Sequence, residues 1–593
     1  MSEFWFHPAL ILLIGAALLP VVPSSLRKGY LLLIPILTFG RTVMLSQGLF
    51  GEVQMLEWTL VFGRVDTLSS VFGYIMTLMC ILGTLYGLHV RDTAQHIASW
   101  TYVAGSLGAI YAGDFLTLFL FWELMAFSSV FLIWLRRRPE SLAAGFRYLL
   151  VHTAGGLVLL AGIVLHCKAA GNGWTFETLD VQNPTLAIYL ILIGFVLNAA
   201  VPPLHAWLPD AYGEGTFNGS VFLCAFTTKT AVYALCRGFP GMEILVPLGV
   251  AMALFGVVYA VLENDCRRLL AYHIISQVGY MVAAVGVGTQ MAINGACAHA
   301  FAHILYKGLL FMGCGAVLHM TGQSKFTSLG GLYKKMPWTF VFTLIGGLSI
   351  SAFPLFSGFV SKSMIVQSSF DEHLLWAGFL LNLASVGTFL HTGLKVPYFI
   401  WFGKNNCKPE SWKRAADPPW NMMTAMAAAS ILCVFIGCYT PYLYKMLPNP
   451  VEYHPYTSYH VSETLQILLF TAVGFFLLIK KLIPEPTISL DLDWFYRKGA
   501  RGFQWLARKP IQALDSVMGE LYRLAGLIPL MMSARLSGKF DNRVIDGLVD
   551  GIAGSILKLG SRLRVVQRGQ VQENLVLAFA VAAGLLFMLI LGL

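Results

Sequence analysis

The chain has 593 residues, of which 57% are hydrophobic and 12% are charged, and its mean hydropathy is +0.69. This apolar content exceeds that of soluble globular proteins, so the composition predicts an integral membrane protein. The net charge of +10 resides in short loops between apolar segments, which indicates membrane topology and argues against a nucleic-acid partner.

The apolar segments are long enough to cross a bilayer. Windows of about nineteen residues give roughly sixteen spans. The first span, residues 8–22, follows a start that has no lysine or arginine and contains Glu3, so we expect a retained helix and not a cleaved signal peptide. Ten cysteines are scattered without metal-ligand spacing, so we expect neither a metal site nor a cofactor.

The lysines and arginines indicate how the chain is oriented. About fifteen of them lie in one set of alternate loops and about five in the other, which is a clear positive-inside bias. The richer set is therefore expected on the cytoplasmic side of a bacterial or archaeal plasma membrane. Both termini are expected on the extracytoplasmic side.

The four opening spans contain few charges, and we expect them near residues 8–23, 29–47, 66–90 and 97–112. We interpret Asp66 as the boundary of the third span. Glu123 lies near the middle of the fifth span, where a carboxylate is costly and usually lines a pathway. The alternative is a buried carboxylate that a neighbouring hydroxyl or lysine satisfies.

The sixth span contains Arg147 and His152. Arg147 lies only about one turn inside the span, so we expect its side chain to extend to the membrane interface. His152 fits a proton relay as well as a satisfied buried histidine, and the sequence leaves both readings open.

Residues 194–237 form two apolar runs with a polar turn between them. Pro202-Pro203 breaks the first run, and the backbone groups freed by such a break are tolerated in a membrane only where they line protein or a wet cavity. The second run contains Lys229 near mid-bilayer, where a charge costs roughly 2.5–3.5 kcal/mol. A broken helix beside a buried lysine indicates an ion path.

The strings Leu204-His205-Ala206-Trp207-Leu208-Pro209-Asp210 and Thr228-Lys229-Thr230 resemble the antiporter-like membrane subunits of respiratory complex I, membrane hydrogenases and multi-subunit Na⁺/H⁺ (Mrp-type) antiporters. Within this family, the chain looks most similar to the D subunit of the Mrp-type antiporters. The resemblance implies a translocating subunit with inverted repeats and ion sites beside broken helices. It also implies that Glu123 is the family's fifth-helix glutamate.

One position departs from the family pattern. The seventh-helix lysine that normally partners the fifth-helix glutamate is replaced by Asn198. Asparagine can accept a hydrogen bond but cannot titrate. Glu123 therefore lacks its usual cationic partner, and Lys229 is the nearest remaining candidate for that role.

The eleventh span contains three ionisable residues in a row. His299, His303 and Lys307 follow one another at intervals of four residues, which places them on one face of a helix. Imidazole both donates and accepts protons near neutral pH, so this row predicts a proton relay or the wall of a water-filled channel. No carboxylate or cysteine accompanies the two histidines, so we expect no metal there. The preceding span, which includes residues 269–280, is typical of the family, and we interpret it as a packing segment.

The next two spans repeat the earlier pattern. Pro354 and Gly358 predict a second discontinuous helix in the twelfth span, with Lys362 near the break. The thirteenth span contains His391 and Lys395. In both halves of the chain, a broken span is thus followed by a span with an interior lysine.

This order predicts how the chain is organised. We expect N-terminal spans, two five-helix antiporter repeats, two further spans, an amphipathic lateral segment and a C-terminal anchor helix, at residues 1–96, 97–238, 243–403, 404–483, 484–572 and 573–593. The resemblance implies that the two repeats are inverted.

The segment 484–572 is too polar to cross a membrane, with thirteen basic and eight acidic residues. Its apolar residues recur at helical spacing, so we expect amphipathic helices that lie on lipid or against neighbouring subunits. Pro510, Gly526 and Pro529 favour two or three shorter helices over one rod. The segment resembles the lateral helix of the largest antiporter-like subunit of complex I, which an Mrp-type D subunit normally lacks.

We therefore expect an all-α polytopic membrane protein that translocates protons, or exchanges Na⁺ for H⁺, together with other membrane subunits in a lipid bilayer. The expected path is lined by Glu123, Asn198, Lys229, His299, His303, Lys307, Lys362, His391 and Lys395. We find no persuasive catalytic motif, so any bond chemistry is expected in other subunits of a redox-driven translocase. The alternative is a structural or coupling subunit with a degenerate channel, in a redox-driven complex or an ion-coupled uptake system.

Overall fold

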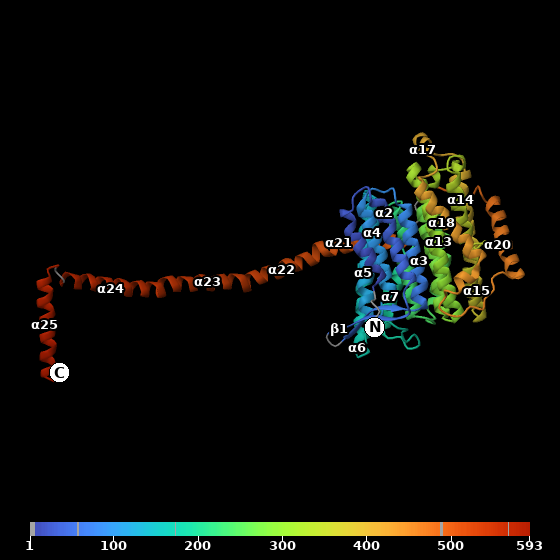
Figure 1. Ribbon diagram of the computed structural model, residues 1–593. Helices are drawn as coiled ribbons and strands as arrows, with labels where there is room; N and C mark the ends of the chain where they lie inside the picture. Colours follow the sequence, from blue (N-terminus) through green and yellow to red (C-terminus); the bar gives the residue numbers. More distant parts are fainter. Residues whose placement is uncertain (1–5, 56–57, 172, 487–489, 567–568, 593) are drawn as a thin grey trace. The chain divides into compact units, whose positions relative to one another are not determined.

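The computed structural model describes residues 6–55, 58–171, 173–486, 490–566 and 569–592. The chain divides into two units, Met1–Asp493 and Trp494–Leu593. Both units are helical (Figure 1), and one two-stranded hairpin is the exception among the described residues.

Unit 1 opens with α1 (Pro8–Leu18), α2 (Arg27–Val43), β1 (Gly48–Met55), β2 (Trp58–Val65), α3 (Thr67–Tyr86) and α4 (Thr93–Ile110). The two strands pair antiparallel, with Gly48 opposite Val65 and Met55 opposite Trp58. No predicted element covers this hairpin, because its glycines and charged residues interrupt the apolar alternation that indicates a strand.

The helices that follow are α5 (Phe115–Trp134), α6 (Pro139–Ala169), α7 (Leu186–Asn198), α8 (Trp207–Glu214), α9 (Gly219–Leu223) and α10 (Thr227–Gly238). Aspartates begin several helices by accepting hydrogen bonds from backbone N–H groups that have no partner inside the helix. Asp66 caps α3 through the backbone N–H of Ser69 at 2.9 Å, and the Ser69 hydroxyl accepts from the backbone N–H of Asp66. Asp66 therefore marks the start of the third span, as expected.

The second half of unit 1 contains α11 (Leu245–Leu262), α12 (Cys266–Val287), α13 (Gln290–Thr321), α14 (Pro337–Ile350), α15 (Ser357–Asp371), α16 (Leu375–Thr388), and the π-helical segments η4 (Phe389–Lys395) and η5 (Tyr398–Phe402). Helix α13 forms the core of this half. Every residue of α13 from Ala292 to Val317 is buried, and α13 packs against α3, α12, α14, α15 and α18. Its many Ala, Gly and Cys residues allow these neighbours to approach closely.

Unit 1 closes with α17 (Pro409–Arg414), α18 (Trp420–Cys438), α19 (Thr440–Tyr444) and α20 (Ser458–Leu477). Short 3₁₀ turns lie at Leu19–Val21, Phe326–Ser328 and Leu332–Lys334. Helix α17 lies at one end of the bundle and the hairpin of β1 and β2 lies at the other (Figure 1). We call these ends the α17 face and the hairpin face.

Within the described residues, eleven helices are long and apolar enough to cross a membrane. Three shorter apolar helices occupy Pro8–Val21, Leu186–Asn198 and Pro337–Ile350. The last two precede the interruptions described below, where one span is made of two pieces. The expected helical, polytopic membrane fold is confirmed, whereas the count of roughly sixteen spans and the two repeats stay predictions.

Unit 2 consists of α21 (Asp493–Leu506), which begins at the unit boundary, and α22 (Gln512–Tyr522), α23 (Ile528–Phe540), α24 (Asp546–Val566) and α25 (Val571–Ile590). The expectation of two or three separate helices before α25 is wrong. The chain stays helical from Asp493 to Val566, because π-helical turns at Ala507–Ile511, Arg523–Leu527 and Asp541–Ile545 join the helices. Pro510 and Gly526 lie inside the first two of these turns, which accommodate them without a break.

Candidate functional site

The first interruption separates α7 from α8. Helix α7 ends at Asn198, Ala200 adopts a left-handed conformation with φ of 61°, and helix resumes at Trp207 after Pro202-Pro203. The indole N–H of Trp207 donates to the carbonyl oxygen of Leu197 at 3.0 Å, so a side chain satisfies a backbone group at the end of α7.

The second interruption separates α14 from α15. Helix α14 ends at Ile350, Ala352 has a φ of 59°, and α15 begins at Ser357 after Pro354. Gly358 lies directly against the backbone carbonyl of Ser349, where a Cβ atom would overlap the carbonyl oxygen. The proline and the glycine thus have separate roles, one ending the helix and the other allowing the two pieces to approach closely.

A third interruption has no sequence signal. Between α9 and α10, residues Cys224 to Phe226 leave the helix although neither glycine nor proline is present. The Nζ atom of Lys229 donates to the carbonyl oxygen of Cys224 at 2.7 Å and to the hydroxyl of Thr228 at 3.1 Å. The lysine therefore satisfies a carbonyl at the end of α9.

Lys362 and Lys395 repeat this arrangement. Nζ of Lys362 donates to the carbonyl oxygen of Ile350, the last residue of α14, at 3.0 Å. Nζ of Lys395 donates to the carbonyl oxygens of Val261 and Glu263 at the end of α11, at 2.6 and 2.9 Å. The last carbonyls of a helix have no partner inside it and carry a partial negative charge, so these three positions stabilise an ammonium group in a buried environment.

The row on α13 is fully buried. Nδ1 of His299 lies 3.0 Å from the hydroxyl of Ser361 on α15. His303 lies one turn further along, with 6.2 Å between the two ring centroids, and Lys307 follows one turn later. Neither ring nitrogen of His303 nor Nζ of Lys307 has a hydrogen-bond partner within the described protein. Buried polar atoms normally have a hydrogen-bond partner, so these atoms are candidates for binding water.

Helix α12 extends this row in two directions. The Tyr280 ring lies 5.1 Å from Nζ of Lys362 and 5.9 Å from the His299 ring, so it bridges α13 and α15. The His273 ring lies 4.7 Å from that of His391, which belongs to the same π-helical segment as Lys395. The sequence pattern indicates a packing segment at residues 269–280 and does not single out these two side chains, because the groups that face them lie on other helices.

The first half contains a sparser set. Glu123 on α5 is half-buried, and one of its carboxylate oxygens is buried without a partner in the described structure. That oxygen lies directly over Gly156 of α6. His152, one turn away on α6, is buried against Tyr148 and Trp207. No hydrogen bond or ion pair joins Glu123 to Lys229 among the described residues, so the structure does not place Lys229 as its direct partner.

Two aspartates restrain the first interruption. Asp210 on α8 forms a bidentate ion pair with Arg147 of α6, at 2.7 and 2.9 Å. Arg147 therefore pairs within the protein, and its expected reach to the membrane interface stays a prediction. Both guanidinium–carboxylate bonds are short and parallel, which makes this pair stronger than a single surface contact.

Asp491, just before α21, contributes the second restraint. Its carboxylate lies 3.0 Å from Nε2 of His205 and accepts from the hydroxyl of Tyr272 at 2.8 Å. Burial raises the pKa of Asp491, but the hydrogen bond and charge of His205 and the bond from Tyr272 outweigh it, so the pKa lies below its ordinary value. His205 lies between α7 and α8, so the start of the lateral segment is bound to the first interruption.

Comparison with known proteins agrees with this geometry. Residues 112–390 match the family model described as NADH:quinone oxidoreductase/Mrp antiporter, transmembrane. The matched residues make up just under half of the chain. They include all three interruptions and the ionisable groups from Glu123 to Lys362.

Two relatives show which proteins this chain is similar to. Hydrogenase-4 component B of Escherichia coli is 30% identical over 416 residues, covering 63% of this chain and 62% of the relative. Na(+)/H(+) antiporter subunit A1 of Staphylococcus haemolyticus is 28% identical over 504 residues, covering 75% of this chain and 62% of the relative. The chain thus spans 62% of the length of each of these relatives. The named Mrp-type relative is an A subunit, so the resemblance to a D subunit stays a prediction.

Two solved structures share the fold of this chain. A chain of the archaeal membrane-bound sulfane sulfur reductase aligns with a TM-score of 0.70 at 23% identity, covering 98% of this chain and 99% of that one. A chain of the Mrp complex from Dietzia sp. DQ12-45-1b aligns with a TM-score of 0.65 at 21% identity, covering 78% and 98%. At these identities the likeness is one of fold.

Proposed function

We propose that this chain translocates protons, with Na⁺ as the alternative coupled ion, as an antiporter-like subunit of a multi-subunit membrane complex. One observation carries the proposal: Lys362, Tyr280, His299, His303 and Lys307 follow one another through the buried centre of unit 1. Ionisable groups are costly inside a membrane protein and usually line pathways. Five of them in sequence are hard to explain by packing alone.

The lysines supply sites that can be loaded and emptied. The Ile350 carbonyl stabilises an ammonium group on Lys362, while the apolar surroundings stabilise that charge less well than water does. A change in a neighbouring charge therefore shifts the balance between the two forms. The neutral imidazoles of His299 and His303 can accept a proton at one nitrogen and release one at the other.

Membership of a larger complex rests on the relatives. One is named as a component of hydrogenase-4 and another as a subunit of a Na(+)/H(+) antiporter, and both matching structures are complexes. We propose other membrane subunits as the partners of this chain. Whether a redox reaction or a sodium gradient drives transport depends on those partners.

The decisive test is Lys362→Met in the complex purified with its natural partners and reconstituted in vesicles. We expect ion flux to fall by about a hundredfold, the scale of a lost proton-transfer group, with subunit content unchanged. A pH-sensitive dye reports proton flux after an imposed sodium gradient and, separately, after an imposed potassium–valinomycin potential. Lys408→Met, at an exposed residue before α17, is the matched control and should keep normal flux. Normal flux in Lys362→Met would remove the translocation proposal.

A structural subunit with a degenerate channel is the second candidate. Asn198 and the lack of a bond between Glu123 and Lys229 in the described structure favour it for the first half of unit 1. If this candidate holds, Glu123→Gln and Lys362→Met should each assemble and leave the ion flux of the complex normal. If only Glu123→Gln is silent, the first half is degenerate and the second half conducts.

The orientation and the organisation of the chain are part of the same proposal. The α17 face is proposed to be cytoplasmic. The N-terminus and the C-terminus are both proposed to be extracytoplasmic. Left-handed alanines at Ala200 and Ala352 support the two repeats. Reporter fusions that place either terminus in the cytoplasm would overturn the orientation.

Deletion from Pro484 onward should loosen the complex if residues 484–572 brace the partners.

A further inference from the structure

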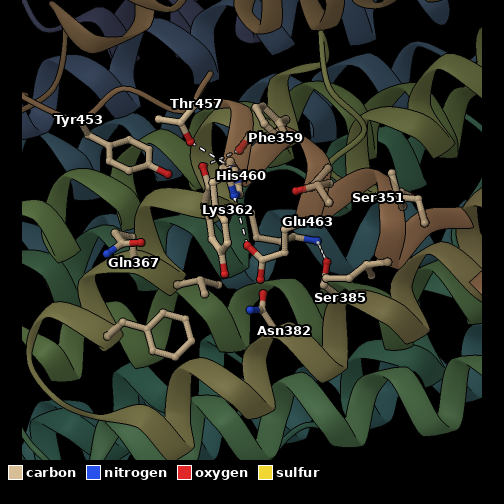
Figure 2. Close-up of a pocket in the computed structure, with 18 of the residues that line it drawn as sticks. Ser351, Phe359, Lys362, Gln367, Asn382, Ser385, Tyr453, Thr457, His460 and Glu463 are labelled. Atoms are coloured by element: carbon tan, nitrogen blue, oxygen red, sulfur yellow. Dashed lines mark hydrogen bonds and ion pairs between the residues drawn. The ribbon is translucent and has the colours of Figure 1, made fainter. Parts of the chain in front are cut away.

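A cavity of about 180 Å³ lies between α15, α16 and α20. Figure 2 shows Lys362 of α15 extending across it toward Ser385 of α16, with His460 and Glu463 on α20. Nζ of Lys362 lies 3.4 Å from the Ser385 hydroxyl. The volume has room for several water molecules, and hydroxyl, amide and carboxylate groups on its wall can hold them.

The cavity lies toward the hairpin face. The segment before α20 contributes Tyr453, His454 and Thr457 to its wall. The carbonyl oxygen of Pro448, earlier in the same segment, accepts a hydrogen bond of 3.5 Å from Thr67, which directly follows the hairpin and begins α3. The cavity therefore lies between the interruption that separates α14 from α15 and the segment that contacts this face.

A histidine and a carboxylate stand on the outer wall. Nδ1 of His460 lies 4.0 Å from a carboxylate oxygen of Glu463, and the side chains are 23% and 37% exposed. The His460 ring stacks on Phe359 of α15, with centroids 4.6 Å apart, which ties this pair to the helix that carries Lys362. A carboxylate on a span that faced lipid would be costly, so its position favours water on this side of α20.

Its position on the cavity wall distinguishes Lys362 from the other buried lysines. Lys229 and Lys307 are fully buried, whereas Lys362 lines the cavity. The titratable groups that face the cavity from the surrounding elements are Lys362, Tyr453, His454, Tyr459, His460 and Glu463. Of these, Glu463 is the carboxyl group of the set, and its protonated form is a stronger acid than an ammonium group, so it can pass a proton to a neutral amine.

We propose that this cavity is a water-filled passage between the hairpin face and Lys362, and that Glu463, which lies beside His460, is the proton-exchanging group at its outer end. This inference rests on the proposed function. Glu463 accepts a proton from water outside, and its carboxylic acid transfers that proton through cavity water to the neutral amine of Lys362. The ammonium group forms as the carboxylate is restored, and the reverse sequence releases the proton.

The passage can be tested without measuring transport. In a chain with Cys407→Ser and Cys438→Ser, the thiols that the structure leaves partly or fully exposed are removed. A charged, membrane-impermeant thiol reagent should then label Ser385→Cys from the hairpin face. Leu383→Cys is the matched control, because it lies on the same helix but on the apolar outer surface. Equal labelling of the two variants, or no labelling of Ser385→Cys, would exclude a wet passage.

The role of Glu463 requires the transport assay. In the assembled complex, we expect Glu463→Gln to lower proton flux by about tenfold and Glu463→Asp to restore most of it. Glu52→Gln, an exposed carboxylate on β1, should leave the flux unchanged. Normal flux in Glu463→Gln with loss of flux in Lys362→Met would overturn the role of Glu463 while the proposed function stands. Normal flux in Lys362→Met would overturn the proposed function, and the labelling result would still decide whether the passage exists.

Discussion

The two halves of unit 1 interrupt their helices alike but surround the interruptions with different chemistry. An alanine in the left-handed conformation follows the first piece in each half, at Ala200 and at Ala352. The same number of residues then leads to Asp210 in the first half and to Lys362 in the second. Asp210 is neutralised by Arg147, whereas Lys362 has carbonyl and hydroxyl partners and no acidic group within 4.0 Å among the described residues.

The two interruptions have similar backbone conformations, but their side chains have different partners. The first interruption is held by Asp210 and Asp491, both of which bind residues on other elements. The second interruption presents a lysine to a cavity and to the row of histidines on α13. An interrupted helix is therefore not in itself an ion site. The ionisable group beside the interruption, and whether a partner already neutralises it, decide what that interruption can do.

The largest expected effect contrasts Lys307 with Glu123. We expect Lys307→Met to lower ion flux by about a hundredfold, because it removes the proposed proton carrier at the end of the row on α13. Glu123→Gln should lower flux by less than about tenfold, since no bond connects Glu123 to a lysine in the described structure. Flux in reconstituted vesicles measures both, and Lys325→Met in an exposed loop is the control. An equal loss of ion flux in the two variants would contradict the view that the two halves of unit 1 differ in function.

Asn198→Lys sharpens the same contrast. It restores the lysine that the family pattern places opposite the fifth-helix glutamate. If only that group is missing, the variant assembles and its flux becomes more sensitive to Glu123→Gln. The double variant Asn198→Lys with Glu123→Gln measures this dependence directly. An unchanged sensitivity would mean that the first half has lost more than one residue of its path.

The next largest effect concerns Asp491. Asp491→Asn should lower the free energy of unfolding by about 2 kcal/mol, since it weakens two bonds to a buried carboxylate. Because the folded pKa is depressed, this stabilisation is present above the ordinary pKa and is lost as the pH falls through the folded pKa. Thermal unfolding of the purified protein at neutral pH measures the difference. Asp515→Asn, exposed on α22, should have no such effect.

These contacts also mark the limit of sequence reasoning. The helical fold, both proline-marked interruptions and the row from His299 to Lys307 follow from local patterns, because spacing and composition act within one helix. The bond between His205 and Asp491 joins residues far apart in the chain, so no local pattern reveals it. The same holds for His273, whose facing partner His391 lies on another element. The break at Cys224 has no glycine or proline to announce it.

A smaller effect is expected for the ion pair of α8. Asp210→Asn should lower the free energy of unfolding by about 1.5 kcal/mol, because it breaks a bidentate pair that is only partly shielded from water. Asp92→Asn is the matched control, since its partner Arg137 is 74% exposed, and about 0.5 kcal/mol is expected there. Thermal unfolding of each variant decides the order. A larger loss for Asp92→Asn would contradict the view that Asp210 restrains the first interruption.

The smallest effect tests whether the two interruptions share one backbone design. Ala200 and Ala352 have φ angles of 61° and 59°, which strain a side chain with a Cβ atom but not glycine. Ala200→Gly and Ala352→Gly should each raise the free energy of unfolding by up to about 1 kcal/mol, because relief of strain exceeds the entropy that glycine adds to the unfolded chain. Ala377→Gly, inside α16, should instead lower it by about 1 kcal/mol. Thermal unfolding measures all three, and gains of similar size at Ala200 and Ala352 would mean that the halves share their backbone and differ in their side chains. A gain at one position and a loss at the other would mean that even the backbone similarity is superficial.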